Sequence, residues 1–380
     1  MSCQKKHPMK TKLSIVMPCL NEIETIELCI SKAQQFMRTH NIDGEVVIGD
    51  NGSTDGSIEK ALAMGAIVVN VKEKGYGNAS RGAIEAANGT YIITADTDDS
   101  HDLLNLKPFI VKLDEGYELV MGNRFKGEQR KNAMPFLHKY VGNPVLTFIG
   151  NLFFKTSIGD FHCGLRGFTK AAYEKMDLNS QGMEFASEIV VKASMLKLNI
   201  TEVPTTVFEA GRTRKPHLRT FPDGWRHLRF LLLYSPKWLF LIPGVLLFFT
   251  GIVGLMVLLN SGSGIEYIRE STLILGIILF SFQFVVFYGL TKIFAVNHGL
   301  IPKSTNYSTL FQYFNLERGL VIGAALTLLG SVLLYTGFIS ELKIESTLKF
   351  IFPAIIAIAL GIQIILFSFF FSILGLAEKK

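Results

Sequence analysis

Four long runs of apolar residues without a charged side chain fill the last third of the chain, and no other feature constrains its fold as much. They cover Leu239–Leu259, Leu273–Thr291, Leu320–Ile339 and Phe350–Leu376. Each is close to or above the roughly 20 residues that a helix needs to cross a bilayer. Charged residues are concentrated before these runs. The break predicts a water-exposed domain followed by four transmembrane helices; buried helices of a large globular protein are the disfavoured alternative.

We therefore expect a soluble domain at 1–220, an amphipathic juxtamembrane segment at 221–238 and a transmembrane domain at 239–380. In the middle segment Trp225, Leu228 and Leu232 share one helical face. This pattern is typical of a helix that lies in the membrane interface. A surface helix packed on the soluble domain is the alternative.

Basic residues predict the orientation of the chain. A basic cluster at 212–229 precedes the first span, and Lys379 and Lys380 follow the last. Four spans would leave both ends on one side, which the positive-inside rule assigns to the cytosol of an inner or plasma membrane. The first ten residues have no apolar core, so we expect no cleavable signal peptide.

The net charge of +6 also suits a nucleic-acid binder. Because the basic cluster adjoins a span, we assign it to lipid headgroups and expect no nucleic-acid partner. The cysteines form no CxxC pair, which favours reduced thiols over a disulfide framework or a zinc site. They are Cys3, Cys19, Cys29 and Cys163.

Short β-rich runs alternate with helical patterns between residues 13 and 121. We expect strands at 13–17, 45–48, 66–71, 91–94 and 118–121, with helices at 24–39, 57–64, 78–87 and 104–113. The strands are almost continuously apolar. This predicts an α/β domain with a mostly parallel sheet and helices on both faces.

Acidic and amide-rich segments follow three of these strands, at 18–22, 50–57 and 96–99. Open α/β sheets bind ligands beyond the carboxyl ends of their strands, so these segments should meet at one binding edge. Asp96 and Asp98 are two residues apart, and such carboxylates suit Mg²⁺ or Mn²⁺ together with substrate phosphates.

Asp50 is expected to accept N–H groups of a nucleobase, with Asn21 and Glu22 on the same nucleoside. Ordinary turn and helix-cap roles are the alternative for residues 50–57. The chain has no GxxxxGK[ST] loop and no GxGxxG after its first strand. ATP hydrolysis and dinucleotide binding therefore lose support.

The three segments resemble the signatures of family 2 glycosyltransferases with the GT-A fold: Met-Pro-Cys-Leu-Asn-Glu at 17–22, Asp-Asn-Gly-Ser-Thr-Asp-Gly at 50–56 and Asp-Thr-Asp at 96–98. Later segments are similar to motifs of the polyprenyl-phosphate branch, which includes dolichol-phosphate mannosyltransferase and bacterial undecaprenyl-phosphate glucosyltransferases. These segments lie at 75–79, 122–125, 160–168 and 202–204. The resemblance covers about the first 230 residues.

The resemblance implies an enzyme that transfers a hexose from a UDP- or GDP-linked sugar to a polyprenyl phosphate, with inversion, for a cell-envelope glycan. Asp96 and Asp98 would hold Mg²⁺ or Mn²⁺ on the diphosphate. Arg124 would face the sugar or a phosphate, and Asp160 stands where the family has a candidate base. The nucleoside site would consist of Pro18, Asn21, Glu22, Asp50, Gly52, Ser53 and Asp55.

The sequence departs from the family at two places. Asn51 stands where the second loop normally has a second aspartate, which puts one donor contact in doubt. The family's Arg-x-x-Gly-x-Ser-Lys stretch is replaced by Arg-Thr-Arg-Lys-Pro-His at 212–217. The chain also has no Arg-Trp pair, which the processive members carry, and this argues against polymer synthesis.

A lipid monophosphate is already an anion at neutral pH, because its second pKa lies near ~6. An obligatory base is then not needed, and Asp160 is as well suited to orienting Arg166 or Arg124 through an ion pair. Arg124 and the basic segment that includes Arg212, Arg214 and Lys215 would bring the lipid phosphate to the donor. A solvated basic turn that meets phospholipid heads is the alternative for that segment.

Two other functions stay open. One is transfer to another membrane lipid, such as a diacylglycerol or a lipid-linked saccharide, which would require a base. The other is a transporter or flippase with a sugar-nucleotide-sensing domain, although charged residues inside the membrane usually mark transport pathways and these spans have none. The sugar, the choice of UDP or GDP, the lipid length and a homo-oligomeric state are also left open.

Overall fold

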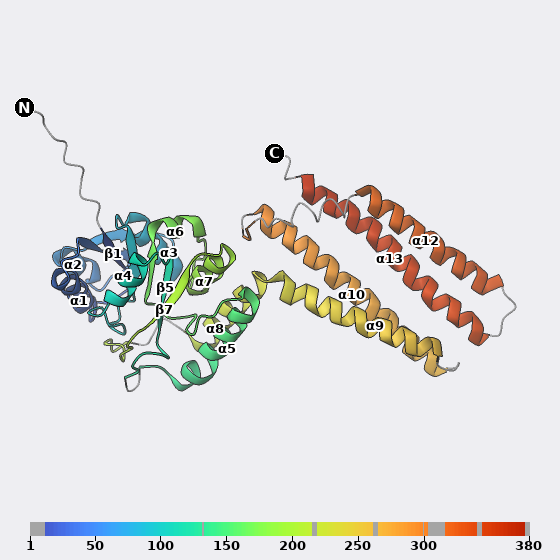
Figure 1. Cartoon of the computed structure of the whole chain (residues 1–380), viewed down its shortest axis with the longest axis horizontal. Helices are drawn as coiled ribbons and strands as arrows, with labels where there is room; N and C mark the ends of the chain where they lie inside the picture. The colour runs from blue at the N-terminus through green and yellow to red at the C-terminus, as the bar shows by residue number, and fades with distance from the viewer. Residues whose placement is uncertain are drawn as a thin grey trace, which may run out of the picture. The chain divides into compact units, whose positions relative to one another are not determined.

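The computed structural model describes residues 12–130, 133–214, 219–260, 265–298, 300–302, 316–339 and 344–376. Cys3, Lys215, Lys379 and Lys380, named above, lie outside these ranges. The chain divides into two compact units, Met1–Leu231 and Leu232–Lys380, and each is described by itself (Figure 1).

The described strands of the first unit form one seven-stranded sheet in the order β3-β2-β1-β4-β6-β5-β7. The strands are β1 (Leu13–Cys19), β2 (Gly44–Asp50), β3 (Ile67–Asn70), β4 (Tyr91–Thr94), β5 (Leu119–Asn123), β6 (Arg166–Thr169) and β7 (Ile200–Pro204). The helices of this unit are α1 (Ile26–Thr39), α2 (Ser57–Ala63), α3 (Tyr76–Ala86), α4 (Lys107–Asp114), α5 (Asn143–Phe154), α6 (Lys170–Met176), α7 (Phe185–Met195) and α8 (Thr220–Leu233), with a π-helical turn η1 (His138–Gly142) before α5.

The sheet is mixed, with one reversed strand. β1 pairs in parallel with β2 and β4, as do β2 with β3 and β5 with β7, whereas β6 runs antiparallel between β4 and β5. The expected helices and parallel strands between residues 13 and 121 are confirmed to within three residues. The end of β6 nearest the site is Arg166, which pairs with Thr94 of β4 and Met121 of β5.

Helices cover both faces of the sheet, as the apolar strands predict. On α1 the apolar side chains recur every three or four residues, so Ile26, Ile30 and Phe36 lie on one buried face. They share a core with Ile15 of β1 and Phe109 of α4. α3 packs against β1, β2 and β3. Coverage on both faces explains why β1 is buried along almost its whole length.

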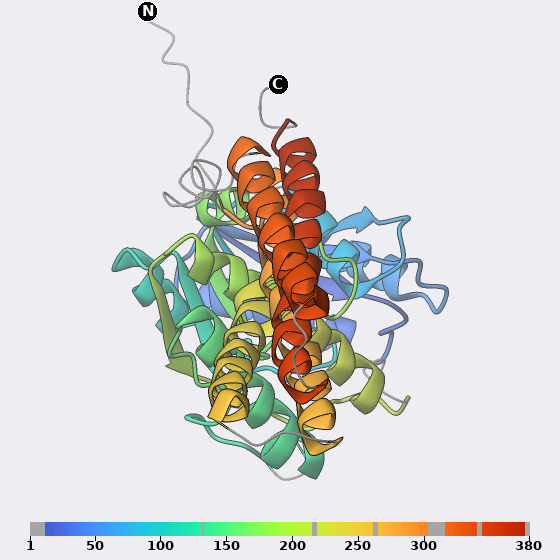
Figure 2. The same ribbon diagram turned by 90° about the vertical axis from the view of Figure 1, so that its right-hand side faces the viewer.

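The described residues of the second unit include four helices that are long and apolar enough to cross a membrane: Lys237–Leu258, Tyr267–Asn297, Leu316–Ile339 and Phe350–Leu374. They belong to the π-helical turn η2 (Lys237–Leu241) with α9 (Ile242–Asn260), and to α10 (Ile265–Asn297), α12 (Leu316–Ile339) and α13 (Ile344–Leu376). α9 packs along α10 and α12 along α13, as both views show (Figure 1, Figure 2). The expectation of four transmembrane helices is confirmed.

Glycines bring α12 and α13 close together. A Cβ built on Gly330 of α12 would lie 2.7 Å from the carbonyl oxygen of Ala354 on α13. One built on Gly323 would lie 2.7 Å from the carbonyl oxygen of Gly361. Any side chain at these positions would collide with backbone, so close helix packing in this pair depends on glycine.

α8 forms the end of the first unit. It buries Asp223 and His227, whereas Phe221 and Trp225 are exposed. Leu228, which was predicted to share a face with Trp225, is half-buried. α8 therefore packs one face against the rest of the first unit and carries exposed apolar side chains on a second face.

Candidate active site

The site lies at the carboxyl ends of β1, β2 and β4, where the three predicted segments meet. The hydroxyl of Thr97 donates a hydrogen bond to the carbonyl of Pro18 at 2.9 Å, and the amide N–H of Asn51 donates to the carbonyl of Cys19 at 2.9 Å. These bonds join the segments after β4 and β2 to the end of β1. The parallel register of the three strands explains why residues so far apart in sequence reach the same edge.

The carboxylates of the loop after β2 shape the loop itself. Asp50 is fully buried and accepts the N–H of Gly52 at 2.8 Å and that of Ser53 at 3.2 Å. Asp55 accepts the hydroxyl of Ser57 at 2.6 Å and the N–H of Ile23 at 3.0 Å. Burial by itself would raise the pKa of Asp55, but these hydrogen bonds outweigh burial and lower the pKa.

Asn21 is held by the same loop. Its N–H donates to the Ser53 hydroxyl at 2.9 Å, and its side-chain oxygen accepts the N–H of Thr54 at 2.8 Å. Its backbone has a φ of 56°, in the left-handed region that asparagine tolerates better than most residues. The segment after β1 and the loop after β2 are therefore one hydrogen-bonded body.

Asn51, the departure from the family pattern, fixes the loop before α3. Its amide nitrogen donates to the carbonyls of Val71 at 3.1 Å and Glu73 at 2.8 Å, and its amide oxygen accepts the N–H of Gly75 at 2.7 Å. Gly75 has a φ of 137°, and a Cβ there would lie 2.2 Å from the carbonyl oxygen of Gln181. An aspartate at position 51 has no N–H to donate, so it would not make the first two bonds.

Asp96 is held by two side chains that the sequence did not single out. Its carboxylate accepts the hydroxyl of Tyr76 at 3.0 Å and lies 3.2 Å from Nε2 of His101. Burial by itself would raise the pKa of Asp96. The hydrogen bond and charge of His101 and the hydroxyl of Tyr76 outweigh burial, so the pKa lies below its usual value. Asp96 is therefore ionised and fixed in orientation at neutral pH.

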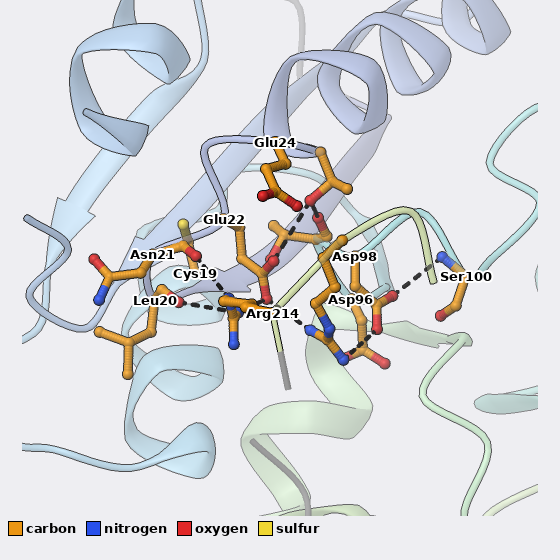
Figure 3. Close-up of polar contacts among 12 residues, drawn as sticks. Cys19, Leu20, Asn21, Glu22, Glu24, Asp96, Asp98, Ser100 and Arg214 are labelled. Atoms are coloured by element: carbon orange, nitrogen blue, oxygen red, sulfur yellow. Dashed lines mark hydrogen bonds and ion pairs between the residues drawn. The ribbon is translucent and has the colours of Figure 1, made fainter. Parts of the chain in front are cut away.

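Asp98 and Glu22 share an arginine from a distant part of the chain. Arg212 contacts Oδ2 of Asp98 at 3.0 Å and Oε1 of Glu22 at 2.8 Å. Arg214 also pairs with Glu22 (Figure 3). Burial raises the pKa of Glu22, and the charges of Arg212 and Arg214 offset this only in part.

Arg124 and Asp160 form a buried ion pair beside these carboxylates. Nε and Nη2 of Arg124 contact the two oxygens of Asp160 at 2.7 and 2.9 Å, and the Arg124 backbone N–H donates to the same carboxylate at 3.1 Å. Burial by itself would lower the pKa of Arg124, but Asp160 outweighs burial and raises it. Arg166 instead donates to the carbonyls of Cys163 and Ala186, so the partner of Asp160 is Arg124.

A cavity of about 1240 Å³ opens over this edge. Among the predicted site residues, Pro18, Glu22, Asp96, Asp98 and Arg124 line it. Asn21 and Asp55 line a second cavity of about 250 Å³ together with Glu22. Asp50, Gly52, Ser53 and Asp160 line neither of these two cavities. Ser53 holds Asn21 and Asp160 holds Arg124, whereas Asp50 and Gly52 bond within their own loop.

Apolar side chains form another part of the lining of the larger cavity, the apolar wall. Leu137 contributes from just before η1, Val141 from η1 and Val145 from α5, and Phe221 and Trp225 contribute from α8. All five side chains are exposed on the surface of this unit. One cavity thus joins an ionised edge to an apolar, solvent-facing wall.

Two carboxylates at this edge are suitable ligands for a divalent cation. Asp96 and Asp98 both face the larger cavity and offer hard oxygen donors. Within the described ranges, no group of three or more His, Cys, Asp or Glu side chains is arranged to hold a metal. This set fits a cation such as Mg²⁺, which commonly takes one or two carboxylates and fills its shell with phosphates and water.

Comparison with known proteins agrees with this arrangement. Residues 14–177 match the model for glycosyl transferase family 2, and residues 289–375 match the model for the glycosyltransferase family 2 C-terminal transmembrane region. The low-salt glycan biosynthesis hexosyltransferase Agl6 of Haloferax volcanii is 36% identical over 377 residues, which is 96% of this chain and 89% of that protein.

Two further relatives match a smaller share of the chain. A dolichyl-phosphate hexose transferase of Haloferax volcanii is 29% identical, covering 53% of this chain and 86% of its own. A dolichol-phosphate mannosyltransferase of Pyrococcus furiosus is 27% identical, covering 66% of this chain and 71% of its own.

The mixed sheet and the carboxylates at the end of β4 define the class as a GT-A glycosyltransferase. The chain belongs to glycosyltransferase family 2, in the subgroup with a C-terminal transmembrane region. The resemblance drawn from the sequence is thereby confirmed, as are the enzyme class and the four-helix membrane domain.

Proposed function

We propose that this protein transfers a hexose from a nucleoside-diphosphate sugar to a polyprenyl phosphate in the membrane, with inversion at the anomeric carbon. The observation that carries the proposal is that Asp96 and Asp98 line the same cavity as exposed apolar side chains of α5 and α8. Hexosyl transfer and a dolichyl phosphate acceptor also appear in the names of relatives.

The donor would lie across the carboxyl ends of the strands. Asn21 and the loop after β2 would surround the nucleoside, together with Lys74, which lines the larger cavity and donates to the carbonyl of Asn51. Asp96 and Asp98 would hold Mg²⁺ or Mn²⁺ against the diphosphate. When bound, such an ion offsets the negative charge that builds on the leaving diphosphate.

The acceptor would enter from the apolar wall. A lipid monophosphate brings its own negative charge, so no strong base has to generate the nucleophile. Arg124 lines the cavity, and Asp160 fixes its guanidinium in a two-pronged ion pair. An arginine held in this way positions an anionic acceptor beside an anionic donor and screens their repulsion.

The exposed face of α8 favours a lipid acceptor over a soluble one. Phe221 and Trp225 face solvent on a helix that ends four residues before the first candidate span. Exposed aromatic side chains next to a span are typical of the membrane interface. We propose that α8 and α5 lie at the membrane surface and that the catalytic unit is on the cytosolic side.

The test uses the full-length protein in detergent with undecaprenyl phosphate, dolichyl phosphate or diacylglycerol. Each acceptor is combined with Mg²⁺ or Mn²⁺ and a panel of labelled UDP- and GDP-sugars. We expect label in the organic phase with one donor and a polyprenyl phosphate. Transfer only to diacylglycerol, or no transfer by a protein that still binds the donor, would refute the proposal.

Asp98→Asn provides the control for the metal. It keeps the size of the side chain but removes a charged oxygen ligand. We expect turnover to fall by at least about 100-fold at saturating metal, since a lost electrostatic contact at a reacting phosphate typically costs this much. Near-normal turnover of Asp98→Asn would exclude the metal role.

A further inference from the structure

A short segment of the chain, the arginine strap (residues 211–214), is hydrogen-bonded across the acidic edge, by which we mean the carboxyl ends of β1, β2 and β4 with Glu22, Asp96 and Asp98. Its first N–H, from Gly211, donates to the carbonyl of Asp98 at 2.9 Å. The N–H and hydroxyl of Thr213 both contact the exposed carboxylate of Glu24 at 2.6 Å. Arg214 pairs with Glu22 and also donates to the carbonyl of Asn21 at 2.9 Å, as Figure 3 shows.

Arg212 is the part of the strap that reaches the candidate metal ligands. Its guanidinium bridges Asp98 and Glu22 at 3.0 and 2.8 Å, and all three side chains are largely buried. Buried carboxylates are costly unless a positive charge accompanies them. Arg212 therefore supplies, from the chain itself, the positive charge that a divalent cation would otherwise bring to Asp98.

Arg212 and a cation compete for Asp98. Arg212 contacts Oδ2 of this carboxylate at 3.0 Å, and Oδ1 accepts the N–H of Ser100 at 3.1 Å. A cation on the same carboxylate would also be repelled by the guanidinium, because two positive charges a few ångström apart in a largely buried site repel strongly. Arg212 has an alternative anchor in Glu22, and the neighbouring Thr213 is held by Glu24, at an exposed position. The contacts thus allow Arg212 to leave Asp98 without losing every partner.

We propose that Arg212 is a built-in counter-cation of the metal site and that the arginine strap must release Asp98 before Mg²⁺ or Mn²⁺ binds. The inference rests on the proposed metal role of Asp98. It implies that the cation alone binds weakly, because it first has to displace an ion pair. The strap then acts as a latch on the metal site.

The direct test is the affinity for Mn²⁺ alone, measured by the electron paramagnetic resonance of free Mn²⁺ with full-length protein in detergent. In Arg212→Gln the competitor is gone, and we expect the Kd for Mn²⁺ to fall by about tenfold, the equivalent of one charge-assisted hydrogen bond. Lys32→Gln is the matched control. It removes the same charge from a pair with the neighbouring Asp99 at 2.6 Å, and its Kd should stay within about twofold.

The variant Glu24→Ala distinguishes release of the strap from a general effect of charge on Mn²⁺ binding. Removing a negative charge near the site should by itself weaken Mn²⁺ binding. The same change also frees the strap from both bonds to Thr213, so the latch predicts tighter binding instead. Because Glu24 is exposed, this variant should fold even where Arg212→Gln does not.

The outcomes distinguish the latch from the proposed function. A Kd in Arg212→Gln or Glu24→Ala that equals or exceeds that of the wild type, with binding lost in Asp98→Asn, overturns the latch and leaves the metal site intact. Mn²⁺ binding by Asp98→Asn that matches the wild type overturns both. Tighter binding in Arg212→Gln and Glu24→Ala, unchanged in Lys32→Gln, supports the latch.

Discussion

Asp160 is better understood through Arg124 than as an acid or base. Its side chain is fully buried, and both of its oxygens are occupied by the guanidinium. The N–H groups of Gly159 and Asp160 itself donate to Glu202 at 2.5 and 3.1 Å, so Glu202 fixes the loop that presents Asp160. A carboxylate held in this way is suited to orienting a cation, and proton transfer would first require breaking the pair.

Asp160→Asn tests this role. The change leaves Arg124 buried without its charge partner, which typically costs roughly 3–5 kcal/mol. We expect a lower melting temperature of the full-length protein in detergent and a lower rate, but an unchanged shape of kcat/KM against pH. If Asp160 were the base, the rise of kcat/KM with pH would disappear in the variant. That result would contradict the positioning role.

Two histidines, the buried His227 and the half-buried His162, make stability depend on pH. His227 of α8 bonds through Nδ1 to the hydroxyl of Ser187 at 2.9 Å, and Nε2 of His162 lies 3.3 Å from the same hydroxyl. Burial, with the charge of Arg166 adding to it, lowers the pKa of His227 to about 4. Burial also lowers the pKa of His162, and the nearby His227 contributes. Both rings are therefore neutral in the folded protein at pH 7.

The direction in which stability changes with pH follows from the difference in the pKa of His227 between the folded and unfolded chain. Between about pH 6.5 and 4 the unfolded chain protonates His227 while the folded chain does not, so stability falls as the pH falls through this window. The shift in the pKa of His227 corresponds to a loss of about 3 kcal/mol at most in the free energy of unfolding. We expect His227→Gln to show a smaller drop in melting temperature from pH 7 to 4.5 than the wild type. The exposed His40 provides the control, since His40→Gln should keep the wild-type drop; equal drops in all three proteins would contradict the prediction.

At the residue scale, the sequence predicted which side chains gather at the site, and the structure adds contacts among them that no local pattern shows. Asp96 and Asp98 follow a buried strand, and that local pattern was sufficient to place them. Asp50 and Asp55 turn inward to hold their own loop, because a carboxylate followed by free N–H groups satisfies them first. The pairing of Glu22 with Arg212 joins residues 190 positions apart, and no local pattern encodes such a contact.

At the element scale, the helices and strands up to β5 follow from periodicity, whereas β6 does not. Its four residues, Arg166–Thr169, contain a glycine and an arginine, so they lack the apolar alternation that marks a strand. Arg166 is fully buried all the same, because its guanidinium donates to backbone carbonyls such as that of Cys163 at 2.7 Å. Tertiary hydrogen bonds thus produce a strand that composition disfavours.

The pair α12 and α13 gives a prediction at the element scale. In Gly330→Val the added side chain meets backbone at 2.7 Å, and overpacking of this kind typically costs about 1–3 kcal/mol. We expect a lower melting temperature of the full-length protein in detergent. Gly276→Val in α10 is the matched control, since a Cβ at Gly276 has no atom within 4 Å. Equal melting temperatures for the two variants would show that α12 and α13 do not pack as described.

At the scale of the whole molecule, the two units have different roles: the first carries the candidate active site and the second carries the membrane helices. The first carries the carboxylates proposed to serve a nucleotide-sugar donor, and it also carries apolar side chains around the same cavity. The second provides four helices suited to cross the membrane, where the proposed polyprenyl phosphate acceptor would reside. An acceptor confined to the membrane is then at high effective concentration, which explains the value of joining both units in one chain.

The orientation of the chain is the prediction on which this division depends, since the proposed nucleotide-sugar donor requires the acidic edge to face the compartment that contains nucleotide sugars. In a Cys3→Ser background, Glu59→Cys places a thiol on the surface of α2, and Ser263→Cys places one in the connection between α9 and α10. The native Cys19, Cys29 and Cys163 are buried and should not react.

With a membrane-impermeant maleimide on intact cells, we expect labelling at position 263 and none at position 59 until the cells are permeabilised, because the basic residues before the first span favour the cytosolic side. Labelling at position 59 in intact cells would place the acidic edge outside. The enzyme would then face no cytosolic nucleotide sugar, and the proposed donor would have to be replaced by a sugar already carried on a lipid.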